Sequence, residues 1–283
     1  MKTRNWLPGA ALGIWFLWRR ATRPRLALAD RVVLIAGGTP EDMQALARAW
    51  LDQGAHVALT GPDAARLEAV CAALEERAAV LPLPADLTDP AAVEAVTASV
   101  RERFGRVDVL VNLPEHVPGG PAQELTAAQV RQATHATLTR TALLSRAVVP
   151  IMQNQGRGHI VNVSRILGDV PGPGSALVSG LDAGIIGFTR ALRREVDPYG
   201  LRVALVLAGG QWPHTTPLAT SPAATAQAVL DAVRDSRQEV ISGGPLLHVA
   251  VWLERLAPWV MDRYWRWVFL PQYIADLSRA SQP

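Results

Sequence analysis

Residues 31–244 alternate between short apolar runs and longer amphipathic segments, and this alternation constrains the fold more than any other feature of the sequence. Helical segments separate the runs, among them one that ends near Asp52 and one around Ala64–Arg77. Strands alternating with helices form a parallel sheet covered on both faces. We therefore predict a single α/β domain with a doubly wound parallel sheet. The apolar runs are VVLIAGG (32–38), HVALTG (56–61), VLPLPADLT (80–88), VDVLVN (107–112), GHIVNVS (158–164) and LRVALVLAGG (201–210).

The composition indicates a folded chain and argues against nucleic acid as a partner. The 283 residues are 49% hydrophobic, which is enough for a full core. A formal net charge of +3 is too small to indicate nucleic-acid binding, and we find no nucleic-acid motif. A single cysteine excludes an intrachain disulfide. We expect no nucleic-acid partner.

Six segments occur in the order and at the spacings of the short-chain dehydrogenase/reductase family, which they resemble. Together they cover roughly residues 28–245, which we assign to one Rossmann-type domain between extensions at residues 1–27 and 246–283. The resemblance implies NAD or NADP as cofactor and oxidoreductase activity. The segments are LADRVVLIAGG (28–38), ADLTD (85–89), FGRVDVLVN (104–112), GRGHIVNVS (156–164), GFTRALRREVDPYGLRV (187–203) and VLAGG (206–210).

The turn after the first strand reads AGGTPEDM at residues 36–43, where the family has a glycine-rich loop beside a helix N-terminus. Gly37 matches the first glycine and is our first cofactor-binding candidate. Glu41 and Met43 replace the other two, so we expect their side chains to occupy the space that a pyrophosphate needs. Thr39 as N-cap, with Glu41 and Asp42 in the first turn, would satisfy this helix end without a ligand.

Three further positions match cofactor contacts of the family. Asp86 matches the adenine-contacting aspartate, Leu87 follows it as expected, and Asn112 matches the first residue of the N-N-A-G motif. Capping of the next helix explains Asp86 equally well. Gly61 and Pro62 stand where the family selects between NAD and NADP, so the sequence does not distinguish the two.

The family's catalytic asparagine, serine, tyrosine and lysine fall on Thr137, Arg165, Val178 and Asp182. Lys2 is the only lysine of the chain, so no Tyr-x-x-x-Lys pair exists anywhere in it. We therefore predict no catalytic residue from the family's set. Arg165 and Asp182 are expected to form a salt bridge if both side chains point into the former active site.

Few other residues are candidates for catalysis or metal binding. Glu115 and His116 follow the fourth strand, where α/β sheets place ligands. His135 and His159 lie elsewhere in the sequence, without metal-ligand spacing, and no nucleophile motif accompanies them. We interpret Glu115 and His116 as a solvated loop pair and predict no metal site.

The N-terminal extension contains the apolar run WLPGAALGIWFLW at residues 6–18, flanked by basic residues. Its thirteen residues are fewer than the roughly 20 of a membrane-spanning helix. We interpret it as an interfacial anchor that faces acidic lipids. A short span with snorkelling arginines and a secretory signal, with residues 27–29 resembling a cleavage site, are the alternatives.

The C-terminal extension is rich in tryptophan and too charged to span a membrane. Pro258 is expected to end or restart its helix. At 100° per residue one side is apolar and another is charged, as in a helix on a membrane surface. Packing on the domain itself or on a partner chain is the alternative. The apolar side holds Leu253, Leu256, Val260, Tyr264 and Trp267, and the charged side holds Arg255, Asp262 and Arg266.

Fold alone does not fix function. The favoured hypothesis is a cytoplasmic, peripherally membrane-associated and catalytically degenerate family member that acts as a scaffold or partner subunit, with a membrane surface as partner of both termini. An active NAD(P)-dependent oxidoreductase with a non-standard site, and a nucleotide or lipid sensor, are the alternatives. The resemblance also implies a homodimer or a heterodimer with a family member, through a helix face carrying Gly180, Ala183, Gly184 and Gly187.

Overall fold

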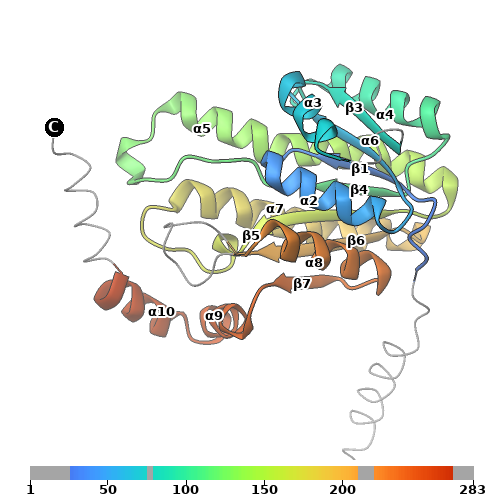
Figure 1. Cartoon of the computed structure of the whole chain (residues 1–283). Helices are drawn as coiled ribbons and strands as arrows, with labels where there is room; N and C mark the ends of the chain where they lie inside the picture. The colour runs from blue at the N-terminus through green and yellow to red at the C-terminus, as the bar shows by residue number, and fades with distance from the viewer. Residues whose placement is uncertain (1–25, 75–78, 210–219, 270–283) are drawn as a thin grey trace, which may run out of the picture.

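The computed structural model describes residues 26–74, 79–209 and 220–269 of the chain. Within these residues, parallel strands form one seven-stranded sheet in the order β3-β2-β1-β4-β5-β6-β7 (Figure 1). The predicted α/β, Rossmann-type fold is confirmed, and each of the six predicted strands is present. The strands are β1 (Val32–Ala36), β2 (His56–Gly61), β3 (Val80–Pro84), β4 (Val109–Asn112), β5 (His159–Arg165), β6 (Arg202–Ala208) and β7 (Glu239–Ser242).

One face of the sheet is covered by α2 (Pro40–Leu51), α3 (Ala64–Ala72) and α8 (Pro222–Arg234). Alternate residues of the strands point into this core, because side chains of a strand alternate between its two faces. Trp50 of α2 is fully buried there. Leu28 belongs to the same core, and the N–H of Leu26 donates to the carbonyl of Arg234, so these residues before the first strand are part of the domain.

The other face is covered by α4 (Pro90–Phe104), α6 (Arg140–Gln155) and α7 (Ala176–Val196). Leu34, Leu110 and Ile160 of the central strands pack against them. Before α6 the chain forms α5 (Ala127–Thr134) and a π-helical turn, His135–Thr139, which leads directly into α6. The central strands are therefore buried on both faces, which explains why they appear in the sequence as continuous apolar runs.

Two elements differ from the predictions. Strand β7 was not predicted, because its four residues EVIS are mostly half-buried at the sheet edge and give no apolar run. The helix predicted around Ala64–Arg77 is α3, which ends at Ala72, and its last predicted residues lie outside the described part of the chain.

The C-terminal segment forms α9 (Pro245–Leu256), α10 (Pro258–Tyr264) and a π-helical turn, Trp265–Phe269. Pro258 restarts the helix as predicted. Leu247, Val251 and Met261 pack against Ile166 and Val170 of the domain. The alternative, packing on the domain's own body, therefore holds for one side of these helices. They lie beside β7 at the edge of the molecule (Figure 1).

Candidate functional site

The turn between β1 and α2 lies at the carboxyl end of the sheet, where doubly wound folds bind ligands. Gly37 and Gly38 both have positive φ, +75° and +91°, a backbone conformation that residues with a side chain rarely adopt. Thr39 caps α2 by accepting a hydrogen bond from the N–H of Asp42 at 3.2 Å, and Pro40 begins the helix. The predicted self-satisfied helix end is confirmed.

The two replaced glycines of this turn have different environments. Glu41 lies at the cleft described below, as expected. Met43 does not occupy the phosphate's space, and that prediction was wrong. Its side chain is 1% exposed and belongs to the core between α2 and the sheet, because position 43 lies on the inward face of the helix.

Arg140, the first residue of α6, is the site residue that the sequence analysis missed. Its side chain is 4% exposed and forms an ion pair with Glu115, with Nη1 2.7 Å from Oε1. Its Nη2 donates to the carbonyl of Leu113. Burial lowers the pKa of the Arg140 guanidinium, and the charge of Glu115 opposes this shift. No motif marked it, since an arginine in an amphipathic helix normally faces solvent.

Side chains cover both glycines of the turn. A Cβ placed on Gly37 would overlap the Arg140 guanidinium and lie 2.7 Å from Oε1 of Glu115. A Cβ placed on Gly38 would lie 2.8 Å from Leu113. The backbone of such a turn must be open for a pyrophosphate to approach it. The residues present here therefore do not fit a dinucleotide in the family's position.

The four positions that match the family's catalytic residues hold an ion pair, an apolar side chain and a threonine whose hydroxyl has no hydrogen-bond partner among the described residues. Arg165 donates from Nε to Asp182 Oδ2 at 2.8 Å, and Asp182 is fully buried, so the predicted ion pair is confirmed. Burial raises the pKa of Asp182 even though Arg165 opposes the shift. Val178 is buried beside them in the wall of the cleft, and Thr137 is buried in the π-helical turn before α6.

The other cofactor-binding candidates lie apart from this cluster. Asp86 is exposed and accepts hydrogen bonds from Thr88, chiefly from its hydroxyl, which lower the pKa of Asp86. Leu87 is buried in the core under α4. The amide of Asn112 donates to Asn162 at 2.8 Å, inside the sheet. The cofactor role of these residues, like that of Gly37, stays a prediction.

A cleft of about 590 Å³ opens over the carboxyl ends of β1, β4, β5 and β6. Its floor is apolar, and its rim carries Glu41, Asp42, Glu115, His116 and Arg165. His116 is exposed, and Glu115 is held by Arg140 instead of being solvated as predicted. Among the described residues, no group of three His, Cys, Asp or Glu side chains is placed to hold a metal ion.

Comparison with known proteins decides the family. A family model described as short chain dehydrogenase matches residues 31–221. The chain belongs to this family. Levodione reductase of Leifsonia aquatica is 34% identical over 197 residues, which are 67% of this chain and 72% of that protein. Dehydrogenase/reductase SDR family member 7B of Bos taurus is 25% identical over 266 residues, which are 85% and 82% of the two chains.

Solved structures of the family agree with this fold. The crystal structure of levodione reductase superposes with a TM-score of 0.70 at 26% identity and covers 78% of this chain and 98% of that one. A 3-ketoacyl-(acyl-carrier-protein) reductase of Brucella melitensis, complexed with NADH, gives a TM-score of 0.70 at 22% identity, over 77% and 98%. At this identity the second likeness shows the fold alone.

Proposed function

We propose that this short-chain dehydrogenase family member is catalytically degenerate and serves as a scaffold or partner subunit. The observation that carries the proposal is the Arg165–Asp182 ion pair, which fills the positions of the family's serine and lysine. A general acid/base must exchange a proton with substrate at the working pH. Arginine keeps its proton at that pH, and valine at the tyrosine position has none to exchange. A nicotinamide cofactor would supply a hydride in this family, and neither Arg165 nor Val178 can exchange the proton that completes that step.

The purified protein is expected to give no turnover above the enzyme-free rate with NAD(H) or NADP(H) and panels of ketones and secondary alcohols. Nicotinamide absorbance measures the rate, with levodione reductase as the active control. Turnover that persists in Asp182→Asn but disappears in Glu115→Gln or His116→Gln would instead identify an active oxidoreductase with a relocated site.

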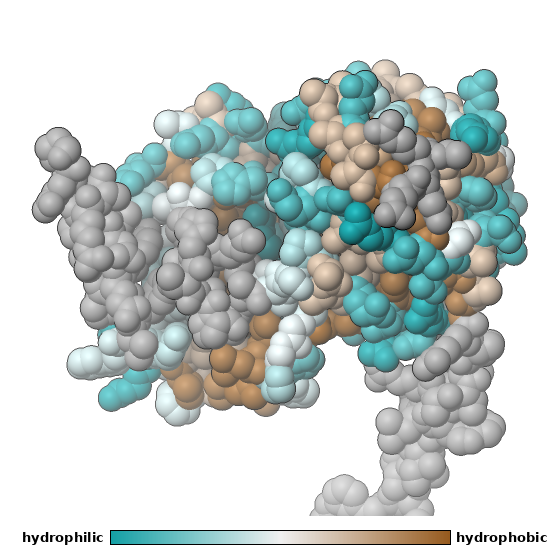
Figure 2. All heavy atoms as spheres, viewed as in Figure 1, coloured by the Kyte–Doolittle hydropathy of each residue, from teal (hydrophilic) through white to brown (hydrophobic). Residues whose placement is uncertain are grey.

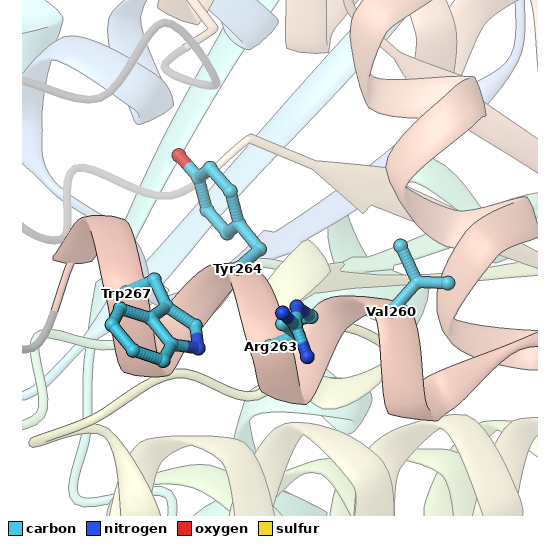
Figure 3. Close-up of a pocket in the computed structure, with 4 residues that line it drawn as sticks. All are labelled: Val260, Arg263, Tyr264 and Trp267. Atoms are coloured by element: carbon cyan, nitrogen blue, oxygen red, sulfur yellow. The ribbon is translucent and has the colours of Figure 1, made fainter.

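We further propose that the C-terminal helices place the protein on a membrane surface. Their side away from the domain exposes large apolar and aromatic residues, of which the leucines and valines appear as a brown patch over α9 (Figure 2). Val260 and Tyr264 of α10, with Trp267 of the π-helical turn that follows, line an open groove of about 410 Å³ beside Arg263 (Figure 3). Tryptophan and arginine together suit the lipid headgroup region. The exposed residues are Leu246, Val249, Trp252, Leu253, Leu256, Trp259, Tyr264 and Trp267.

We propose that these helices lie on the membrane surface and do not cross the bilayer. Within residues 26–74, 79–209 and 220–269, no helix combines the length and the apolar character needed to cross a bilayer. Arg255 forms ion pairs with Asp169 and with Glu239, the latter at 2.7 Å, so the helices are fixed to the domain by charge as well as by packing. The anchor expected at residues 6–18 lies outside the described residues.

Serine at Trp252, Trp259 and Trp267 together is expected to lower partitioning onto acidic liposomes by at least about tenfold, because each buried indole contributes on the order of 1 kcal/mol or more. Sedimentation with phosphatidylserine vesicles measures it. The matched control is Arg146→Ala, an exposed change far from these helices. Deleting residues 1–25 in addition should abolish binding. A wild-type chain that never pellets would contradict the proposal and assign the tryptophans to a protein interface.

A dimer through α7 is also proposed. Gly180, Ala183 and Gly187 are exposed on this helix, and the space beside both glycines is open. Small side chains allow another helix to approach closely, which supports the family's mode of pairing. Large residues at both glycines would block it, so Gly180→Leu/Gly187→Leu should convert a dimer to a monomer in sedimentation velocity. Unchanged sedimentation would exclude α7 as the interface.

A further inference from the structure

Two arginines from different elements converge on residues 113–115, the segment that leaves β4. Arg140 of α6 holds it twice, through the carbonyl of Leu113 and through the carboxylate of Glu115 at 2.7 Å. Arg165, at the end of β5, donates from Nη1 to the carbonyl of Glu115 at 3.1 Å. The other side of the Arg165 guanidinium is held by Asp182. The segment is therefore fixed from both sides across the carboxyl end of the sheet.

The same segment covers the turn at Gly37 and Gly38. Leu113 packs on Gly38, and the Arg140–Glu115 pair packs on Gly37. We infer that residues 113–115 form a strap, held by Arg140 and Arg165, that occupies the nucleotide end of the cleft and excludes a dinucleotide phosphate. The inference rests on the proposed function in one respect, since it takes the family's cofactor turn to be out of use.

Charge reinforces the exclusion. The Arg140 guanidinium meets an internal carboxylate and an internal carbonyl, so two of its donor nitrogens are already engaged. A phosphate reaching this guanidinium must displace Glu115, which would lose its ion pair. Glu41 and Asp42 add negative charge at the same cleft. An incoming dianionic pyrophosphate therefore meets repulsion from Glu41 and Asp42, and behind them a cation that is already paired with Glu115.

Two double variants test this inference, because each removes both charges of the Arg140–Glu115 ion pair and so leaves no unpaired buried charge. Arg140→Ala/Glu115→Ala opens the space over Gly37. Arg140→Met/Glu115→Gln keeps the side-chain volume for folding and removes both charges. The matched control is Arg146→Ala/Glu94→Ala, an ion pair of 3.9 Å between α6 and α4 whose side chains are exposed. NADH and NADPH are titrated by calorimetry into the wild type and each full-length variant, and circular dichroism establishes that each variant is folded.

We expect Arg140→Ala/Glu115→Ala to bind NADH or NADPH at least about tenfold more tightly than the wild type, because it opens the space over Gly37. Arg140→Met/Glu115→Gln releases the strap but keeps the side-chain volume, so it should bind more tightly than the wild type and less tightly than the alanine variant, and the control should match the wild type. The amide of Leu113, which donates to the carbonyl of Ala36 at 2.9 Å, should also exchange hydrogen faster in the site variants, since the strap is released. Calorimetry and exchange are independent of turnover.

The outcomes separate this inference from the proposed function. Folded site variants that bind no tighter than the wild type, or that keep the wild-type exchange rate at Leu113, overturn the strap while the proposed function stands. A wild type that already binds as tightly as the site variants overturns the strap as well. Turnover by the wild type in the carbonyl assay overturns the proposed function, whatever the variants bind.

Discussion

Asp182→Ala is expected to lower the free energy of unfolding by about 3–5 kcal/mol, because it leaves the part-buried Arg165 guanidinium without its carboxylate. Asp182 is fully buried and bonded by Nε and Nη2 of Arg165, at 2.8 and 3.3 Å. Removing one partner of such a pair costs far more than the pair contributes, since the remaining charge is still desolvated.

The double variant Arg165→Met/Asp182→Leu should lose much less stability than Asp182→Ala. Burial outweighs the attraction of Arg165 in setting the pKa of Asp182, which indicates that desolvation cancels most of the benefit of the pair. Apolar side chains of similar volume avoid this cost. Urea unfolding gives the three free energies, and Asp197→Ala is the control, because its partner Arg202 lies 3.7 Å away and both are exposed. Equal losses in the single and double variants would refute this account.

Much of the site was predictable because the family's motifs fix the position of each residue along the sheet. Arg165 and Asp182 are seventeen positions apart in the sequence, but a strand end and the next helix bring them together. Opposite charges at two positions that face one cleft predict an ion pair before any coordinates exist. Thr39 and Pro40 were equally clear, since helix capping depends on local sequence alone.

The two features that could not be predicted from the sequence both depend on which way a side chain points. Position 43 was read as a lost glycine, yet its side chain points into the core, and loop sequence does not show which way a helix faces when it begins. Arg140 lies on a helix whose sequence gives no sign that its first residue turns inward. Its contacts to Leu113 and Glu115 join segments 25–27 residues apart, which only the packed fold brings together.

His159, at the start of β5, has the strongest expected effect of pH on stability. Burial, followed by the charges of Arg202 and Arg31, lowers its pKa from 6.5 to about 4, and Asp108 opposes the shift only in part. The residue is 9% exposed, and the Nε2 of its ring has no hydrogen-bond partner among the described residues. Protonation of this ring therefore places beside two arginines a cation that Asp108 compensates only in part.

Stability is expected to fall by about 3 kcal/mol through His159 as pH drops from about 6.5 to about 4, since each pKa unit corresponds to about 1.4 kcal/mol. The unfolded chain binds the proton in this window and the folded chain does not, so acid favours unfolding, and the loss is absent above pH 6.5. His159→Phe should flatten the fall of the urea midpoint from about pH 6.5 to about pH 4, so that its midpoint rises relative to that of the wild type in acid. His248→Phe, at an exposed position, should keep the wild-type pH dependence. An unchanged pH dependence in His159→Phe would contradict this account and assign the acid sensitivity to other titratable groups.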